Sequence, residues 1–224
     1  MSARDDIFAA IRRSLHVTGE EAPRRAAVTA RLAEAPTGVI PARGHGDSQQ
    51  RAVLFKAEAE RAKASVAEIP RTEDIPAEVA RFLRENNLPA TLRMGEDARL
   101  AALPWSETAL EISHGPSEGH DLNALSAAFA AVAESGTLAL VSGRDNPTTL
   151  NFLPDNHLVV VFADDLVGDL ESVIKRIRSI YGAGEAPRTL NFITGPSRSG
   201  DIEQTLLLGA HGPRRLHIVL VGAS

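Results

Sequence analysis

The hydrophobic positions of this chain follow two periods, and the change between them separates helices from strands. Apolar residues three or four positions apart predict helices at 5–16, 48–64, 76–87 and 170–182. Short apolar runs that are typical of strands occur at 65–70, 89–94, 108–113, 157–163, 189–194 and 216–222. Strands that alternate with helices, and that are too apolar to be half exposed, predict a three-layer α/β domain with a mostly parallel sheet.

An antiparallel insertion in this sheet is predicted at residues 127–143, AAFAAVAESGTLALVSG. Alanine favours helix in its first half, whereas the short second half favours strand. We predict a strand, a turn and a second strand. A short helix is expected before it at 122–126, and a helical turn after it at 146–153.

The first 47 residues have a different pattern from the rest. Ile7, Phe8, Ile11 and Leu15 fall on one face of the first helix. Residues 17–47 have little sustained period and form an arm or linker, in which AAVTARLAEA could make a helical turn or two. Two interpretations remain open: a flexible extension, or an arm that docks on another subunit and forms a homo-oligomer. The predicted organisation is therefore an N-terminal helix and arm at 1–47 and an α/β domain at 48–224.

The composition is that of a globular protein without cysteine. The 224 residues carry a formal net charge of −5 and no dense Lys/Arg block, which argues against nucleic acid as a ligand. Without cysteine there is no disulfide and no cysteine ligand for an iron–sulfur cluster or zinc, so no cofactor is expected to be bound through cysteine. No apolar run has the length of a membrane span and no signal-peptide core is visible, so we expect a cytoplasmic protein.

The segment GPSRSGDIE, residues 195–203, is the densest group of candidate binding residues. It follows the strand predicted at 189–194, and ligands of parallel sheets bind at the carboxyl ends of strands. Serine and aspartate at these positions can cap a following helix, whose free N–H groups favour an anion. The candidate ligand-binding residues here are Gly195, Ser197, Arg198, Ser199, Asp201 and Glu203.

Arg198 makes this segment a predicted anion-binding corner. A guanidinium offers a planar donor pair that suits a carboxylate or phosphate. In the alternative interpretation, the serines and Asp201 only cap the helix, and Arg198 pairs with a surface acid.

Glu134 is a candidate catalytic residue in the turn between the two strands of the insertion. Its carboxylate could accept a proton, act as a nucleophile or bind a partner's N–H groups, if the turn faces the same cleft as Arg198. Gly136 and Thr137 would then be ligand-binding residues. The alternative is that Glu134 is a solvated turn residue.

The histidines add two further catalytic candidates. His157 and His211 are predicted in loops near strand ends, where either could titrate near neutral pH as an acid or base. His217 lies inside a strand and is expected in the core or on a sheet face. A metal site built from His157, His211 and Glu203 or Asp201 is conceivable, but no HxxxH or HExxH pair supports it. No metal ligand is predicted.

Four segments carry a resemblance to a known family. They are AESGTLALVSG at 133–143, LPDNHLVVV at 153–161, ITGPSRSGDIE at 193–203 and LGAHGPRRLHIVLV at 208–221. In this order and separation they resemble the lactate-utilization (LUD) domain family, over about residues 120–222.

The resemblance implies a fold like that of the sugar-phosphate isomerase and CoA-transferase group, distantly similar to 5-formyltetrahydrofolate cyclo-ligase. It also implies membership in a three-protein system that oxidises L-lactate to pyruvate, in which partner proteins carry cysteine-bound iron–sulfur clusters. A cysteine-free chain cannot hold such clusters, so a partner-dependent role is chemically consistent.

This chain departs from the family at three positions. The family has threonine where this chain has Ser135 and Ser199, and alanine where it has Gly200. The hydroxyls are kept, whereas Gly200 loosens the predicted helix entry. The family supplies no catalytic residue that can be transferred to this chain.

Three functions follow as hypotheses. The first is an accessory or regulatory subunit that binds a small carboxylate or anionic cofactor between Glu134, Arg198 and His211. The second is a stand-alone enzyme of the isomerase, CoA-transferase or cyclo-ligase type, with Glu134 as nucleophile or base. The third is a scaffold that assembles through the N-terminal helix.

Overall fold

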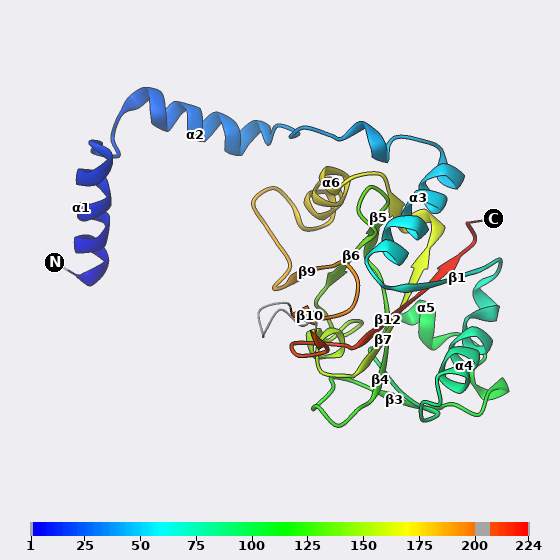
Figure 1. Cartoon of the computed structure of the whole chain (residues 1–224). Coiled ribbons are helices and arrows are strands. Elements are labelled where there is room, and N and C mark those ends of the chain that lie inside the picture. Colours follow the sequence, from blue (N-terminus) through cyan, green and yellow to red (C-terminus); the bar gives the residue numbers. More distant parts are fainter. Residues whose placement is uncertain (1, 200–206, 224) are drawn as a thin grey trace. The chain divides into compact units, whose positions relative to one another are not determined.

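The computed structural model describes residues 2–199 and 207–223 (Figure 1). The chain divides into two compact units, Met1–Val39 and Ile40–Ser224. The candidate sites described below lie in the second unit.

The first unit consists of two helices, α1 (Ala3–Leu15) and α2 (Ala22–Glu34). A capping box between Ser2 and Asp5 begins α1, and its apolar residues, such as Ile7 and Phe8, are exposed. The helix α2 has 13 residues, whereas only a helical turn or two was predicted. Alanine and arginine are strong helix formers, so a helix forms here without a long apolar period.

Three of the four helices of the second unit begin close to where the apolar periods predict them, whereas the four-residue helix at 98–101 was not predicted. The four helices are α3 (Ser48–Arg61), α4 (Ile75–Glu85), α5 (Ala98–Ala101) and α6 (Leu170–Tyr181). Short 3-10 turns are η1 (Ala42–Gly44), η2 (Thr72–Asp74), η3 (Trp105–Glu107), η4 (Thr148–Asn151) and η5 (Ala163–Asp165). Every helix in the described ranges is too short or too polar to cross a membrane.

Six parallel strands form the main sheet. They are β1 (Ser65–Ile69), β2 (Thr91–Met94), β3 (Glu111–His114), β4 (Asn123–Ala127), β7 (Asn156–Phe162) and β12 (Arg215–Val221). Their order across the sheet is β1-β12-β7-β4-β2-β3, so β7 and β12 are neighbouring interior strands. The prediction of a helix at 122–126 was wrong, because β4 fits between β7 and β2 with all five residues buried. Tertiary pairing overrides the local preference of alanine and leucine for helix.

A smaller sheet carries the antiparallel insertion. Its strands are β5 (Ala130–Val132), β6 (Thr137–Val141), β8 (Leu166–Val167) and β9 (Leu190–Ile193). The strands β5 and β6 form the predicted strand–turn–strand unit, and β9 pairs with β6 in antiparallel orientation. The predicted α/β class, with a mostly parallel sheet and an antiparallel insertion, is confirmed.

Alternate residues of β7 point into two different cores. Leu158 and Val160 pack in a cluster with residues of α4 and α5, such as Val79. Val159 and Val161 pack in a cluster that contains residues of α3 and of the smaller sheet. The main sheet is therefore covered on both faces, which explains why its central strands are continuous apolar runs.

The segment after β9 lies at the amino-terminal ends of β7 and β12, not at the carboxyl ends as predicted. The Ser197 backbone N–H donates to the Pro213 carbonyl over 2.9 Å, directly before β12. The Arg214 N–H donates to the Asp155 carbonyl over 2.7 Å, directly before β7. The prediction failed because β9 belongs to the smaller sheet, where it runs antiparallel to β6.

The described part of GPSRSGDIE is extended. The strand β10 (Arg198–Ser199) pairs in antiparallel orientation with β11 (Leu207–Leu208). The predicted helix entry at Gly200, together with Asp201 and Glu203, lies outside the described residues.

Candidate functional site

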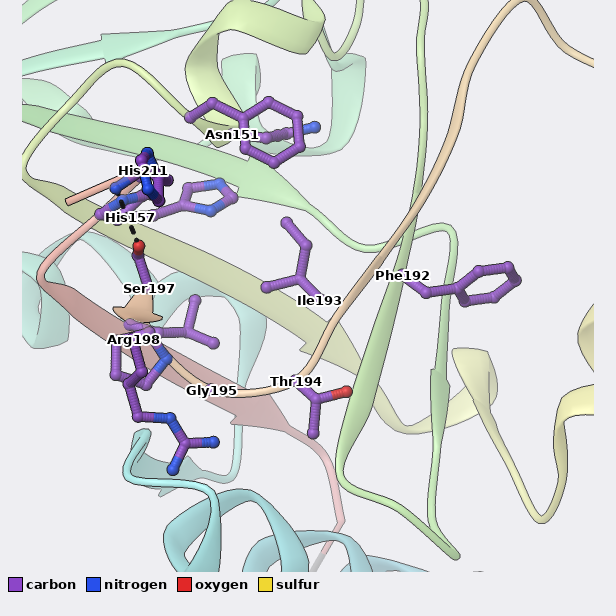
Figure 2. A pocket seen from close by; sticks show the side chains of 14 residues that line it. Asn151, His157, Phe192, Ile193, Thr194, Gly195, Ser197, Arg198 and His211 are labelled. Atoms are coloured by element: carbon purple, nitrogen blue, oxygen red, sulfur yellow. Dashed lines mark hydrogen bonds between the residues drawn. The ribbon is translucent and has the colours of Figure 1, made fainter. Parts of the chain in front are cut away.

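The segment after β9 forms one wall of a cavity of about 280 Å³ at the amino-terminal ends of β7 and β12 (Figure 2). Two further segments complete it, the end of η4 and the turn before β12. Of the residues predicted from the sequence, those that line it are His157, Gly195, Ser197, Arg198 and His211. The cavity therefore brings together five candidates from three distant parts of the chain.

Ser197 accepts two hydrogen bonds that connect the segment after β9 to the turn before β12. Its hydroxyl accepts from the His211 N–H over 3.2 Å, which is the dashed contact in Figure 2. Its carbonyl accepts from the Gly209 N–H over 3.0 Å. Ser197 therefore holds the turn of His211 in place, which differs from the helix-capping role predicted for it.

His157 lies at the bottom of the cavity and is only 1% exposed. It is the second residue of β7 and not a loop residue. Its Nε2 lies 3.1 Å from the Ser126 hydroxyl, and its Nδ1 is buried without a hydrogen-bond partner in the described part of the chain. Burial lowers the pKa of His157 to about 3, because a charged ring would have no hydrating water at this position. His157 is therefore neutral at neutral pH, and the prediction that it titrates there was wrong.

Asn151, at the end of η4, is a lining residue that sequence reasoning missed. It is 1% exposed, and neither its Oδ1 nor its Nδ2 has a hydrogen-bond partner within residues 2–199 and 207–223. Buried amides are normally hydrogen-bonded, so two free atoms on one side chain are unusual. The only signal in the sequence is an amide placed between the apolar residues Leu150 and Phe152.

Gly195 allows the chain to pass close to the end of α3. Its φ is +74°, and a Cβ atom here would lie 2.1 Å from the Ala62 carbonyl oxygen. Both the left-handed backbone and the close approach require glycine. The turn that was predicted from this residue is therefore also a packing contact between β9 and α3.

Arg198 and His211 are exposed at the cavity. Figure 2 shows that the Arg198 guanidinium points away from the imidazoles of His157 and His211. The innermost polar groups of the cavity are thus neutral, whereas the positive charge of Arg198 belongs to its outer part.

Glu134 is buried, 8% exposed, at the start of α6. Its Oε1 accepts from the Leu170 N–H over 3.4 Å, and its Oε2 is buried without a partner among the described residues. It does not line the cavity of His157 and Arg198. The structure therefore does not form the single cleft of Glu134, Arg198 and His211 that was predicted, and Glu134 is not a solvated turn residue either.

Gly136 and Thr137 lie beside this cavity and do not line it. The Thr137 hydroxyl lies 2.8 Å from that of Ser135 and 2.7 Å from that of Thr194, which is a lining residue. Gly136 has a φ of +64° and packs on α3, where a Cβ would lie 2.4 Å from the Ala59 nitrogen. Thr137 therefore supports the wall of the cavity through Thr194, whereas Gly136 serves the packing of its turn on α3.

Ser199 is part of β10 and does not line the cavity, and Asp201 and Glu203 lie outside the described residues. No group of three His, Asp or Glu side chains within residues 2–199 and 207–223 is placed to hold a metal ion. The chemistry available in the described cavity is hydrogen bonding by a neutral imidazole and an amide, with a positive charge outside.

Comparison with known families agrees with the resemblance seen in the sequence. Residues 123–221 match the family model of the LUD domain. This range contains β4, β7 and β12 and every described lining residue of the cavity. The resemblance to the LUD domain family is confirmed.

Similar curated proteins carry the name lactate utilization protein C. The protein from Shouchella clausii is 36% identical over 90 residues, which cover 40% of this chain and 39% of that relative. The protein from Exiguobacterium sp. is 31% identical over 152 residues, 63% of this chain and 65% of that relative. The matched part thus spans about two fifths of the first relative and less than two thirds of the second.

A solved structure has a similar fold. The crystal structure of a DUF162 family protein from Deinococcus radiodurans covers 80% of this chain and 100% of its own, with a TM-score of 0.59 and 20% sequence identity. At this identity the likeness concerns the fold alone, and it agrees with the α/β architecture.

Proposed function

We propose that this protein is a component of a lactate-utilization system, and that the cavity at Asn151 and His157 binds a small 2-hydroxy or 2-oxo acid. The observation that carries the proposal is a set of three buried polar atoms that have no hydrogen-bond partner among the described residues: Asn151 Oδ1, Asn151 Nδ2 and His157 Nδ1. Buried polar atoms cost free energy unless they are hydrogen-bonded, so a cavity lined by such atoms is suited to a polar ligand.

The size and polarity of the cavity favour a small molecule with two kinds of oxygen. An amide can donate to and accept from a hydroxyl, and it can donate to an oxo group. The carboxylate of the same molecule would lie toward Arg198, whose flexible side chain supplies charge-assisted hydrogen bonds. A 2-hydroxy or 2-oxo acid has both groups on adjacent carbons.

The redox step in this proposal belongs to partner proteins. The chain has no cysteine, and so it cannot ligate an iron–sulfur cluster through thiolates. The name lactate utilization protein C, carried by its relatives, supports a place in the same system. We therefore assign the chain an accessory or regulatory role beside cytoplasmic iron–sulfur proteins. We do not extend the proposal to catalysis by Glu134, because that carboxylate lies outside the cavity.

Titration calorimetry with L-lactate, pyruvate and propionate tests the binding step. Propionate lacks the oxygen at carbon 2 and should bind at least tenfold more weakly than the other two acids. Asn151→Asp places a like charge in the cavity and should abolish binding. Asn191→Asp, which makes the same change on β9 outside the cavity, should not. Equal binding of the three acids, or equal affinity of the two variants, would contradict the proposal.

The partner role has a separate test. Purified iron–sulfur partner proteins should support lactate-dependent electron transfer with this chain present, and Asn151→Asp should lower that rate. If the rate is the same with and without the chain, the accessory role is wrong, whatever the binding result.

A further inference from the structure

A second cavity lies at the carboxyl ends of β7 and β12, opposite the ends that carry the first cavity. Its volume is about 570 Å³, roughly twice that of the first. The segments directly after β7 and β12 form one side of it, and the first turn of α3 forms the other. The lining residues used below are Ser48, Gln49, Arg51, Asp164 and Gly222.

Arg51 is the cationic residue of this cavity, and it has no anionic partner among the residues that the structure describes. Its Nε atom is buried without a hydrogen-bond partner, and no carboxylate pairs with its guanidinium in the described part of the chain. Other partly buried arginines do have such partners: Arg93 pairs with Asp121, Arg99 with Asp97 and Asp165, and Arg176 with Asp165. A half-buried guanidinium that lacks an acceptor is suited to an anion supplied from outside.

Arg51 lies beside a point where the backbone at Gly44 passes close to the backbone at Gly168. A Cβ atom built on Gly168 would lie 2.3 Å from the Gly44 carbonyl oxygen and 3.7 Å from Arg51 Nε. Only glycine permits the two segments to approach so closely. The Arg51 side chain therefore has a rigid backbone wall on one side and the cavity on the other.

The surroundings of Arg51 include backbone groups that favour an anion and one carboxylate that restricts which anion fits. The segments after β7 and β12 are the carboxyl ends of neighbouring parallel strands, where ligands of α/β sheets usually bind. Ser48 and Gln49 lie in the first turn of α3, where backbone N–H groups have no intrahelical acceptor. The Asp47 carboxylate accepts from the Gln50 N–H over 2.8 Å, so the N–H groups of Ser48 and Gln49 are the ones left for a ligand. Asp164 is exposed at the edge of the cavity and disfavours ligands that are negatively charged over their whole surface.

We propose that this second cavity binds an oxyanionic small molecule, with its phosphate or carboxylate head on Arg51. Gly222 leaves room for such a ligand, since a Cβ built there would have no atom within 4 Å. The site is separate from the small-acid cavity, because the two share no lining residue and lie at opposite ends of β7 and β12. Binding here does not depend on the function proposed above.

Calorimetric titration of the full-length protein with pyrophosphate and with succinate tests this site and distinguishes the two kinds of head group. At least one of the two anions should bind, and Arg51→Gln should weaken that binding at least tenfold. Arg61→Gln removes the same charge from the other end of α3 and should change the affinity less than twofold. Arg198→Gln, in the first cavity, should also leave it unchanged. Absence of binding to the wild type, or loss of binding in Arg198→Gln instead of Arg51→Gln, would overturn the proposal.

A thermal-unfolding comparison tests whether Arg51 has a purely internal role. Glu134 approaches the same glycine, since its N–H donates to the Gly168 carbonyl over 3.1 Å, and its Oε2 has no partner among the described residues. If Arg51 served only to neutralise Glu134, Arg51→Gln and Glu134→Gln would lower the melting temperature non-additively and would leave anion binding unaffected. The proposed site instead predicts that Glu134→Gln retains anion binding and that the anion raises the melting temperature of the wild type but not of Arg51→Gln.

Discussion

Two buried histidines on neighbouring strands of the central sheet differ in how fully they are hydrogen-bonded. His157 on β7 is 1% exposed and His217 on β12 is 2% exposed. In the parallel register His157 lies opposite Leu216 and His217 lies opposite Leu158, so the two rings point to opposite faces of the sheet. Their depth is the same, and only their neighbours differ.

His217 has a partner for each part of its ring. Its Nε2 donates to Glu78 Oε1 over 3.1 Å, and its Nδ1 lies 2.8 Å from the Ser65 hydroxyl. Phe82 stacks on the ring with centroids 4.0 Å apart. Glu78 is also held by Arg81, whose Nε donates over 2.7 Å. This network is complete within the protein, so the expectation that His217 is a core residue is confirmed.

His157 has a partner for one nitrogen only, and the neighbouring Asn151 has none for its amide among the described residues. Since both histidines are buried but only His217 is fully hydrogen-bonded, burial alone does not separate structural polar residues from binding residues. The free hydrogen-bonding capacity of a buried group is the informative quantity, because it costs stability unless a ligand or water uses it.

The largest expected difference between the two histidines is in the pH dependence of the free energy of unfolding, to which buried His157 should contribute most. Its pKa is about 3 in the folded protein against 6.5 in the unfolded chain, so only the unfolded chain binds the proton between these values. The free energy of unfolding should therefore fall as the pH drops from 6.5 toward 3, by at most about 5 kcal/mol. Chemical denaturation between pH 7 and 5 measures it, and His157→Gln should show a shallower fall. Equal slopes for the two proteins would mean that His157 is not held neutral.

The complete network of His217 should give the second largest effect. Burial raises the pKa of Glu78, but the hydrogen bonds from His217 and Arg81 outweigh it and bring the pKa down to about 2. This contribution is present above about pH 4.5 and is lost as the pH falls toward 2. Glu78→Ala leaves the buried ring of His217 without its acceptor and Arg81 with Glu85 alone, and it should cost about 3 kcal/mol at pH 7.

Glu85→Ala is the matched control for that variant. Glu85 pairs with the same Arg81 but is exposed, so its loss should change the unfolding free energy by less than about 0.5 kcal/mol. Neither variant should alter the affinity for lactate. A loss of ligand affinity in Glu78→Ala would show that the two faces of the sheet are coupled.

Two asparagines extend the comparison with a smaller effect. Asn123 Nδ2 donates to the carbonyls of Pro89 and Thr91, each over 3.0 Å, whereas the Asn151 amide has no partner among the described residues. Asn123→Leu should cost about 2 kcal/mol because it leaves acceptors unpaired, and Asn151→Leu should be neutral or stabilise by about 1 kcal/mol. Urea denaturation measures both. A large loss of stability in Asn151→Leu would indicate a structural role for its amide.

The smallest expected effect on stability concerns the first unit of the chain. Deletion of residues 1–20 removes exposed apolar residues of α1 and should change the unfolding free energy of the α/β domain by less than about 0.5 kcal/mol. If the arm forms a homo-oligomer, which is one of the two interpretations open for it, light scattering should show a smaller particle after the deletion. An unchanged particle mass would contradict oligomer formation through the N-terminal arm.

Much of the fold could be predicted because local pattern and tertiary environment agree. The apolar period of α6 and the continuous apolar run of β7 each have one simple solution. Residues 122–126 could not be predicted, since a buried strand and a short helix can have the same composition. The position of GPSRSGDIE could not be predicted either, because the sequence does not say which sheet β9 joins.

The candidate site was predicted in part. His157, His211 and the glycine-rich segment were identified from their types and order, and the resemblance to the LUD domain family was read from four segments. Three features were not predictable: the separation of Glu134 from this cavity, the low pKa of His157, and the lack of a hydrogen-bond partner for the Asn151 amide within the described ranges. Each depends on residues that are distant in the sequence.

The sequence by itself therefore determined the fold class, the family resemblance and the lack of thiolate chemistry, because these follow from residue types and their periods. Only the tertiary structure decided which end of the sheet each candidate occupies and which buried nitrogen or oxygen has no partner. Hydrogen bonding and desolvation act over a few ångströms in space, and chain folding brings together at that distance groups such as Ser126 and His157.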